Sequence, residues 1–175
     1  RVLFRSCAVQ VSAQTLYRYL PDELLSSSTS DAIYPSISDD GRFVVFQQYS
    51  GSFGEHELML VDRSARPAAP VRLFPCEGDT RPDFCFDFPS EARPRISGNG
   101  RFVLFQTRRP IAGFFIDTND ANDIYRLDRQ TGDLLLVSMS STGGVADGPS
   151  EMGELSREGS SATVMSRASN LSTGA

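Results

Sequence analysis

The residues with the clearest capacity for ligand chemistry lie in one short acidic segment, 117–123, which reads D-T-N-D-A-N-D. Asp117, Asn119 and Asp123 offer hard oxygen ligands within this segment, and calcium prefers such ligands. The segment lacks the glycine and the distal glutamate of an EF-hand loop. The same residue types also stabilise turns through hydrogen bonds to the backbone. The sequence therefore leaves two interpretations, a calcium site or a metal-free turn, and indicates no other cofactor.

The adjacent acids Asp39 and Asp40 have the residue types of a glycosidase acid pair. Neighbours on a tight hairpin point in different directions, however, and the equivalent positions 98–99 and 157–158 of the repeat described below carry no carboxylate pair. A serine hydrolase needs a base beside its nucleophile, but the chain has no G-x-S-x-G segment. Its single histidine, His56, is expected in a polar loop. The sequence therefore predicts a turn at 39–40 and no catalytic residue.

Cysteine spacing bears on the cellular compartment. Cys76 and Cys85 bracket a short polar loop, and a disulfide between them would suit an extracytoplasmic protein. The alternative is two reduced thiols. A zinc site is not expected because no third cysteine lies nearby, and Cys7 is interpreted as a small apolar strand residue.

Charge and hydropathy exclude two classes of partner. All 17 basic residues are arginine, which points to a GC-rich bacterial genome, and the net charge is −5. Nucleic-acid binding needs a concentrated basic surface, so we expect no nucleic-acid partner. No apolar run approaches the roughly 20 residues that span a bilayer. We therefore expect no direct membrane span.

The elements that position these residues come from an internal repeat. Gly41, Gly100 and Gly159 stand 59 residues apart, within the aligned segments 35–47, 94–106 and 153–165. Each segment predicts a hairpin, in which a short apolar strand is followed by a turn whose glycine supplies a positive φ. A second hairpin follows at 123–138, with its counterpart at 57–74. Four strands per repeat of about 59 residues is one propeller blade.

The predicted fold is therefore all-β: β-propeller blades of four antiparallel strands, in an incomplete propeller. We expect one propeller domain divided into four parts. Residues 1–30 form the outer strands of a first blade (Arg5–Gln10 and Leu16–Leu20) and a linker, 31–90 a second blade with the Cys76–Cys85 insertion, 91–150 a third blade, and 151–175 the inner strands of a fourth.

The repeat resembles a known family. The patterns P-x-I-S-x-x-G-R-F-V-x-F and D-T-N-x-x-x-D-I-Y-x-x-D-R-x-T-G, best seen in Pro94–Ser138, are similar to the TolB-like (WD-like) propeller repeats of bacterial envelope and secreted proteins. The first full repeat departs from the pattern, because it lacks the D-T-N loop. The resemblance implies an extracytoplasmic location (periplasm, cell surface or secreted). It identifies no ligand.

The expected function is a non-enzymatic scaffold or protein-interaction module of the bacterial cell envelope or of a larger complex, with other protein subunits as partners. One alternative is an accessory propeller of a larger, peptidase-like hydrolase, and another is a carbohydrate-binding propeller. The repeated Asp62-Arg63 and Asp128-Arg129 pairs have two interpretations, an interaction patch or salt bridges at the blade edge.

The repeat also predicts that these residues do not close into a propeller alone. The 175 residues make just under three blades of 59, whereas closed propellers have ~4–8 blades. We therefore expect Met152–Leu155 and Ser160–Ser166 to lie beside further strands, supplied by additional chain or by another subunit of an oligomer or assembly.

Overall fold

The computed structural model describes residues 31–49, 56–65, 67–74, 92–108, 111 and 118–171, together with four short strands before residue 25. Every regular element in this part of the chain is a strand. The strands are β1 (Leu3–Phe4), β2 (Cys7–Ala8), β3 (Arg18–Tyr19), β4 (Glu23–Leu24), β5 (Ala32–Ile37), β6 (Phe43–Tyr49), β7 (His56–Asp62), β8 (Pro70–Arg72), β9 (Arg95–Ile96), β10 (Phe102–Thr107), β11 (Asp123–Asp128), β12 (Leu134–Leu136), β13 (Ser150–Leu155) and β14 (Ala162–Ser166).

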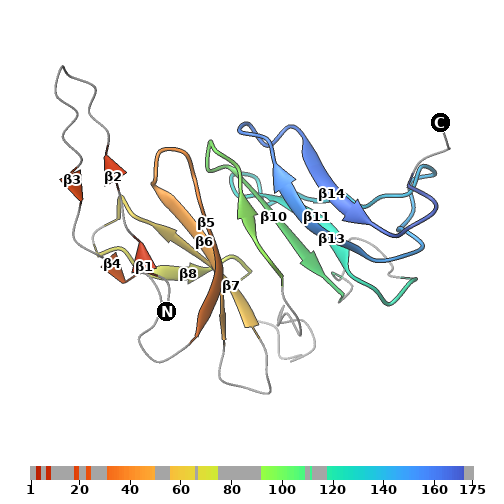
Figure 1. The fold of residues 1–175 in the computed structure, drawn as a ribbon, viewed down its shortest axis with the longest axis horizontal. Coiled ribbons are helices and arrows are strands. Elements are labelled where there is room, and N and C mark those ends of the chain that lie inside the picture. The colour runs from red at the N-terminus through yellow and green to blue at the C-terminus, as the bar shows by residue number, and fades with distance from the viewer. Residues whose placement is uncertain are drawn as a thin grey trace.

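The strands form successive antiparallel sheets. Two sheets have four strands, in the orders β5-β6-β7-β8 and β9-β10-β11-β12, and are called blades B and C below. The hairpin β13–β14 follows as a two-stranded sheet, here called half-blade D. Figure 1 shows these sheets side by side, with β2–β3 at one end of the array and β14 toward the other. The expected all-β fold of four-stranded blades in an incomplete propeller is confirmed.

Repeat positions occupy equivalent places in successive sheets. The inner strands β5, β9 and β13 end at Ile37, Ile96 and Leu155, as the sequence predicts. Val103 is buried with Val45, Leu60 and Ile96 in a core between blades B and C. Its neighbour Leu104 points the opposite way, because successive side chains of a strand alternate between faces. Each whole blade is therefore apolar on both faces, as stacking requires.

Glycine allows half-blade D to approach blade C closely. A Cβ built on Gly153 would come within 2.3 Å of the Leu104 side chain. Leu104 is only 1% exposed, because half-blade D covers it. A larger residue at 153 would therefore hold the two sheets apart.

A backbone feature that the repeat did not predict recurs within β5 and just before β9. Tyr34 and Arg93, which are 59 residues apart, have φ angles of 53° and 44°. Positive φ is uncommon for residues other than glycine. In blade B this conformation accompanies a break in register between Ile33 and Ser36. Because the same conformation recurs in blade C, it belongs to the repeat.

The N-terminal strands pair with one another. β2 pairs with β3, placing Cys7 opposite Tyr19, within the ranges expected for an outer hairpin. β1 also pairs with β4, which the repeat did not predict. No helix among the described residues could span a membrane.

Candidate interaction surface

The turns of the inner hairpins form a continuous feature at one end of the sheets. Each turn closes with a hydrogen bond from the glycine N–H to the serine carbonyl three residues earlier, at 2.8–2.9 Å. Gly41, Gly100 and Gly159 have φ angles of 71°, 72° and 68°. This left-handed conformation explains the repeated glycine. We call the three turns, residues 38–41, 97–100 and 156–159, the turn rim.

Side-chain hydrogen bonds stabilise the first turn. The Ser38 hydroxyl donates to Asp40 Oδ1 at 2.6 Å and accepts the Phe43 N–H at 2.9 Å. Asp40 Oδ1 also accepts the Arg42 N–H at 2.9 Å. These hydrogen bonds, chiefly the one from Ser38, lower the pKa of Asp40. Asp40 therefore stabilises the turn, as expected for the Asp39–Asp40 pair.

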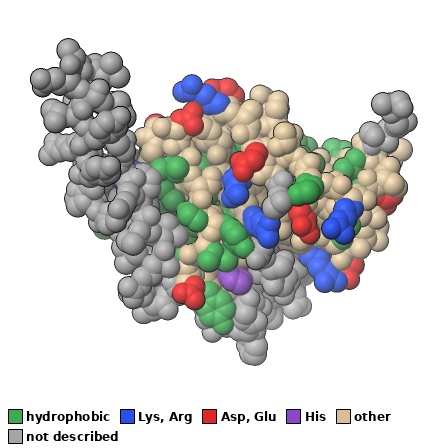
Figure 2. Space-filling view, viewed as in Figure 1, with side chains coloured by type: hydrophobic (Ala, Val, Ile, Leu, Met, Phe, Trp, Pro, Cys, Tyr) green, Lys and Arg blue, Asp and Glu red, His purple; other side chains and the backbone are tan. Residues whose placement is uncertain are grey.

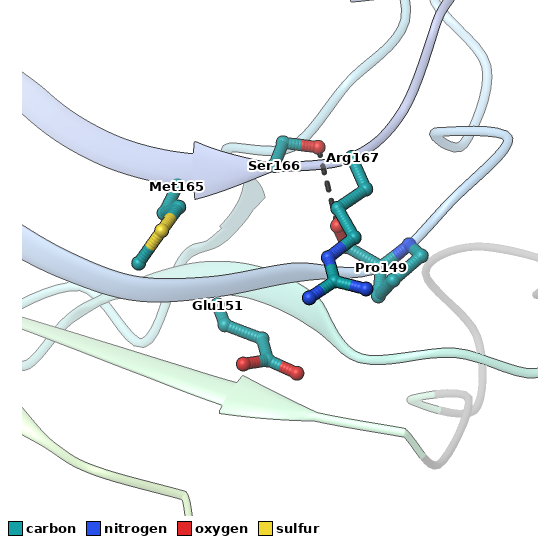
Figure 3. Close-up of a pocket in the computed structure, with 5 residues that line it drawn as sticks. All are labelled: Pro149, Glu151, Met165, Ser166 and Arg167. Carbon is teal, nitrogen blue, oxygen red and sulfur yellow. Dashed lines mark hydrogen bonds between the residues drawn. The ribbon is translucent and has the colours of Figure 1, made fainter.

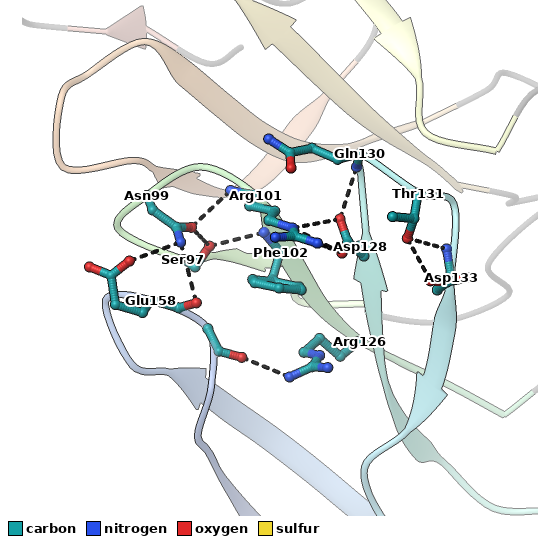
Figure 4. A network of polar contacts seen from close by, with 11 residues as sticks. Ser97, Asn99, Arg101, Phe102, Arg126, Asp128, Gln130, Thr131, Asp133 and Glu158 are labelled. Carbon is teal, nitrogen blue, oxygen red and sulfur yellow. Dashed lines mark hydrogen bonds and ion pairs between the residues drawn. The ribbon is translucent and has the colours of Figure 1, made fainter.

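The second turn uses the same contacts with an amide in place of the acid. The Ser97 hydroxyl donates to Asn99 Oδ1 at 2.7 Å, and the Arg101 N–H donates to the same oxygen at 3.0 Å. The Phe102 N–H donates to Ser97 Oγ at 3.0 Å. Figure 4 shows this network, with the Asn99 amide also directed toward Glu158 of the third turn. The neutral Asn99 side chain therefore accepts the same two hydrogen bonds in this turn as the Asp40 carboxylate accepts in the first.

The three turns are joined across the blades by their backbones. The Asp39 N–H donates to the Gly98 carbonyl, and the Asn99 N–H donates to the Arg157 carbonyl, each at 2.9 Å. Arg157 Nε also lies 3.0 Å from Asp39 Oδ2, so an ion pair connects half-blade D with blade B. The repeat alone did not predict this pair, although positions 39, 98 and 157 share the 59-residue spacing.

The Asp-Arg pairs at the ends of β7 and β11 are engaged within their blades. Arg42 Nη2 lies 2.7 Å from Asp62 Oδ2, and Arg101 Nη2 lies 2.5 Å from Asp128 Oδ2. Hydrogen bonds from these arginines are the main cause that lowers the pKa of both aspartates, that of Asp128 to about 2. The contacts support the salt-bridge interpretation, with each aspartate bound to the arginine that directly precedes the neighbouring strand.

The arginine of each Asp-Arg pair, Arg63 or Arg129, binds the turn of its own blade. Arg63 Nη1 donates to the Gly41 carbonyl at 2.7 Å, and Arg129 Nε donates to the Gly100 carbonyl at 2.8 Å. The Arg129 guanidinium also lies 4.0 Å from the centroid of the Phe43 ring, a cation–π contact between blades C and B. Each arginine thereby fixes the turn of its own blade.

Phenylalanine rings pack the turns of one blade against the next. A Cβ on Gly100 would come within 2.5 Å of the Phe43 ring, and one on Gly159 within 2.2 Å of the Phe102 ring. Each ring therefore fills the space that the glycine of the next turn leaves open. Backbone hydrogen bonds, arginine side chains and ring packing therefore all restrain the turn rim.

The acidic segment lies away from the rim, at the opposite end of blade C. Asn119 Nδ2 donates to the Ala146 carbonyl at 2.6 Å, and Asn119 Oδ1 accepts the Ala121 N–H at 2.8 Å. Asp123 is buried, and its Oδ1 accepts the Ser138 hydroxyl at 2.8 Å. These contacts favour the turn interpretation. Asp117 lies outside the described residues, so the calcium site at Asp117, Asn119 and Asp123 stays a prediction.

The remaining candidate residues fall elsewhere. Cys76 and Cys85 lie outside the described residues, and their disulfide stays a prediction. The expectation of a loop at His56 is wrong. This residue opens β7, and its ring meets that of Tyr49 edge to face at 5.7 Å, because β7 pairs with β6 over their full length. Among the described residues no group of three His, Cys, Asp or Glu side chains could hold a metal ion.

The outer surface of the rim carries charges of both signs. Arg157 and Glu158 side chains are 76% and 70% exposed, and that of Asp39 is 53% exposed. Figure 2 shows arginine and acidic side chains interspersed on the visible face. Such a mixed surface suits a protein partner better than a polyanion.

The fold of the chain resembles that of solved propeller structures. No family model and no curated protein matches the chain. Among solved structures, the putative TolB from Agrobacterium tumefaciens superposes with a TM-score of 0.55 and 14% identity, over 95% of this chain and 50% of that chain. The chain has a TolB-type propeller fold.

Other structures superpose less well. TolB from Acinetobacter baumannii gives a TM-score of 0.49 with 20% identity, covering 78% of this chain and 27% of that chain. Pyrococcus horikoshii acylaminoacyl peptidase gives 0.34 with 14% identity, over 60% and 17% of the two chains. This chain therefore spans half or less of the TolB structures that it resembles. At these identities the TolB-type likeness concerns the fold alone.

Proposed function

We propose that this chain is a non-enzymatic scaffold, an interaction module of the bacterial cell envelope or of a larger assembly, and that its turn rim binds a partner protein. The observation that carries the proposal is the construction of the rim. Three turns from three sheets are joined by backbone hydrogen bonds and present exposed charges of both signs.

A preformed surface of this kind suits protein recognition. Binding orders the groups at an interface, and a surface that is already ordered avoids part of that cost. Charges at an interface rim mainly set the partner's orientation and the association rate. The proposal also places the protein outside the cytoplasm, supported by the resemblance of the D-T-N repeat to envelope propellers and by the TolB-type fold.

Cross-linking in the source bacterium, followed by mass spectrometry of the purified complex, tests the proposal. The rim variant is Arg157→Glu, which removes the ion pair with Asp39 and reverses an exposed charge. The matched control is Arg108→Glu, because Arg108 pairs with Asp120 (N–O 2.7 Å) on an exposed surface at the other end of blade C.

We expect a specific partner to be captured by the parent protein and by the Arg108→Glu variant, and capture to fall at least tenfold with Arg157→Glu. Equal capture by both variants would exclude the rim as the binding surface. Capture of no protein by the parent would contradict the scaffold function itself.

A further inference from the structure

The second turn of the rim contains the one Asn-Gly dipeptide of the chain, Asn99-Gly100. An asparagine before glycine is chemically labile, because glycine has no Cβ to shield its backbone nitrogen from the carbonyl carbon of the asparagine side chain. The other asparagines, Asn119, Asn122 and Asn170, precede aspartate or leucine. Asn99 is also exposed, so water reaches its side chain. Asn99 is therefore the asparagine of this chain that is most open to attack by the residue after it.

Deamidation of this dipeptide needs water and no other reactant. The Gly100 nitrogen attacks Asn99 Cγ and forms an N–C bond, while the bond from Cγ to Nδ2 breaks. Nδ2 leaves as ammonia and takes with it the proton of the Gly100 N–H. Water then opens the cyclic imide at one of its two carbonyls, which leaves aspartate or isoaspartate at position 99 and adds one negative charge to the turn.

The folded turn holds the reacting groups in other contacts. The Gly100 N–H donates to the Ser97 carbonyl at 2.8 Å, so the attacking nitrogen is engaged. Asn99 Oδ1 accepts hydrogen bonds from the Ser97 hydroxyl and the Arg101 N–H, at 2.7 Å and 3.0 Å. The Phe43 ring packs where a Cβ on Gly100 would lie, which restricts the backbone there. Cyclisation must break these contacts, so the turn slows the reaction.

Half-blade D holds the leaving group. Asn99 Nδ2 donates to Glu158 Oε2 at 3.2 Å and to the Glu158 carbonyl at 3.3 Å (Figure 4). The Asn99 N–H also donates to the Arg157 carbonyl at 2.9 Å. The attacking nitrogen is thus fixed within blade C, whereas the leaving nitrogen is fixed by a different sheet. Loss of the contact with Glu158 would free the Asn99 amide to turn toward Gly100.

The hairpin of half-blade D is closed by its own hydrogen bonds at the end away from the rim. The Ser166 hydroxyl donates to the Pro149 carbonyl at 3.3 Å, as Figure 3 shows. The Arg167 N–H donates to the same carbonyl at 2.9 Å. These bonds do not depend on blade C, and proteins open locally at contacts between such units. The contact between Asn99 and Glu158 can therefore break while half-blade D stays folded.

We infer that Asn99 is a site of spontaneous deamidation in the folded protein, and that its hydrogen bonds to Glu158 set the rate. The product alters the same contact. An aspartate at this position still accepts hydrogen bonds from Ser97 and Arg101, as Asp40 does from the equivalent residues of the first turn. It cannot donate to Glu158, however, and it places a second carboxylate beside that side chain. Deamidation therefore loosens the junction between blade C and half-blade D irreversibly.

Incubation of the chain in mildly alkaline buffer, with and without urea, tests the inference. Peptide mass spectrometry follows the exchange of the amide NH₂ for OH at position 99. We expect deamidation in both solutions, at least tenfold faster in urea, where the turn is open. Glu158→Ala should raise the rate in buffer at least threefold. Glu154→Ala is the matched control and should leave it unchanged, because Glu154 joins half-blade D to blade C through Arg95 (N–O 2.7 Å) rather than through Asn99.

Hydrogen exchange of the position-99 N–H measures the consequence, because this group donates to the Arg157 carbonyl. Asn99→Asp should lower its protection at least threefold. The Asp39 N–H, which donates to the Gly98 carbonyl between blades B and C, is the internal control and should keep its protection. Circular dichroism checks that each variant folds. No deamidation at position 99 in buffer, equal rates in buffer and urea, equal rates in the two glutamate variants, or unchanged protection in Asn99→Asp would each overturn the inference.

Discussion

Asp39 and Arg157 occupy the same position in blade B and half-blade D, and they form an ion pair across the blade between them. Arg157 Nε lies 3.0 Å from Asp39 Oδ2. The equivalent residue of blade C is Gly98, and a Cβ there would come within 2.5 Å of the Asp39 carboxylate. The missing side chain at 98 therefore gives Asp39 the room to reach Arg157.

This relationship predicts that Gly98→Ala separates the pair without unfolding the protein. Exposed ion pairs contribute about 0–1 kcal/mol and weaken with salt. A double-mutant cycle with Asp39→Asn and Arg157→Gln, read from urea unfolding, should give a coupling free energy in that range. In the Gly98→Ala background the coupling should vanish. An unchanged coupling in that background would mean that Gly98 does not make room for the pair.

Substituting a turn glycine by alanine should lower the free energy of unfolding by an amount that depends on what lies beside that glycine. Gly132 and Gly100 both have positive φ, 81° and 72°, but nothing lies within 4 Å of a Cβ on Gly132. Gly132→Ala should cost about 1–2 kcal/mol for the left-handed backbone alone. Gly100→Ala should cost roughly 1–3 kcal/mol more, because the Phe43 ring occupies the space. Equal losses in urea unfolding would contradict the packing role of Phe43.

Acid should weaken the blades through Asp128. Its pKa is lowered from 3.8 to about 2 in the folded state, mainly by the hydrogen bond from Arg101. Because the folded pKa lies below the unfolded one, this stabilisation is fully present above pH ~4 and is lost as the pH falls toward 2. The free energy of unfolding, measured from pH 5 to pH 2, should therefore fall. Asp128→Asn should reduce the slope, and an unchanged slope would contradict the assignment.

The repeat made the fold predictable, because three glycines at one spacing require three equivalent turns. The ends of the inner strands at Ile37 and Ile96 followed from the same alignment. The Asp39–Arg157 pair was not predicted, because contacts between non-adjacent blades depend on how closely the sheets stack around Gly98. His56 was misplaced because its polar neighbours hide a strand that pairs with β6 over its full length.

Cys76 and Cys85 are expected to be covalently linked. Cys76 and Cys85 bracket an insertion after blade B, and we expect them to form a disulfide. A bridge closing so short a loop should stabilise the protein by about 2–3 kcal/mol. Intact mass after alkylation without reductant should show one modified thiol, that of Cys7. Three modified thiols would refute the disulfide.

Calcium distinguishes the two interpretations of segment 117–123, because a calcium site requires the ion for its stability and a metal-free turn does not. If Asp117, Asn119 and Asp123 bind calcium, backbone carbonyls and water complete the site at about 2.3–2.6 Å. The ion would stabilise the folded state by mass action, so millimolar calcium should raise the melting temperature above that in excess EDTA. Asn119 and Asp123 already accept hydrogen bonds from Ala121 and Ser138, which favours the metal-free turn. An Asp117→Asn variant is the control, since it should remove any calcium-dependent rise. A melting temperature that is the same in calcium and in EDTA would exclude the site and leave the turn as the role of these residues.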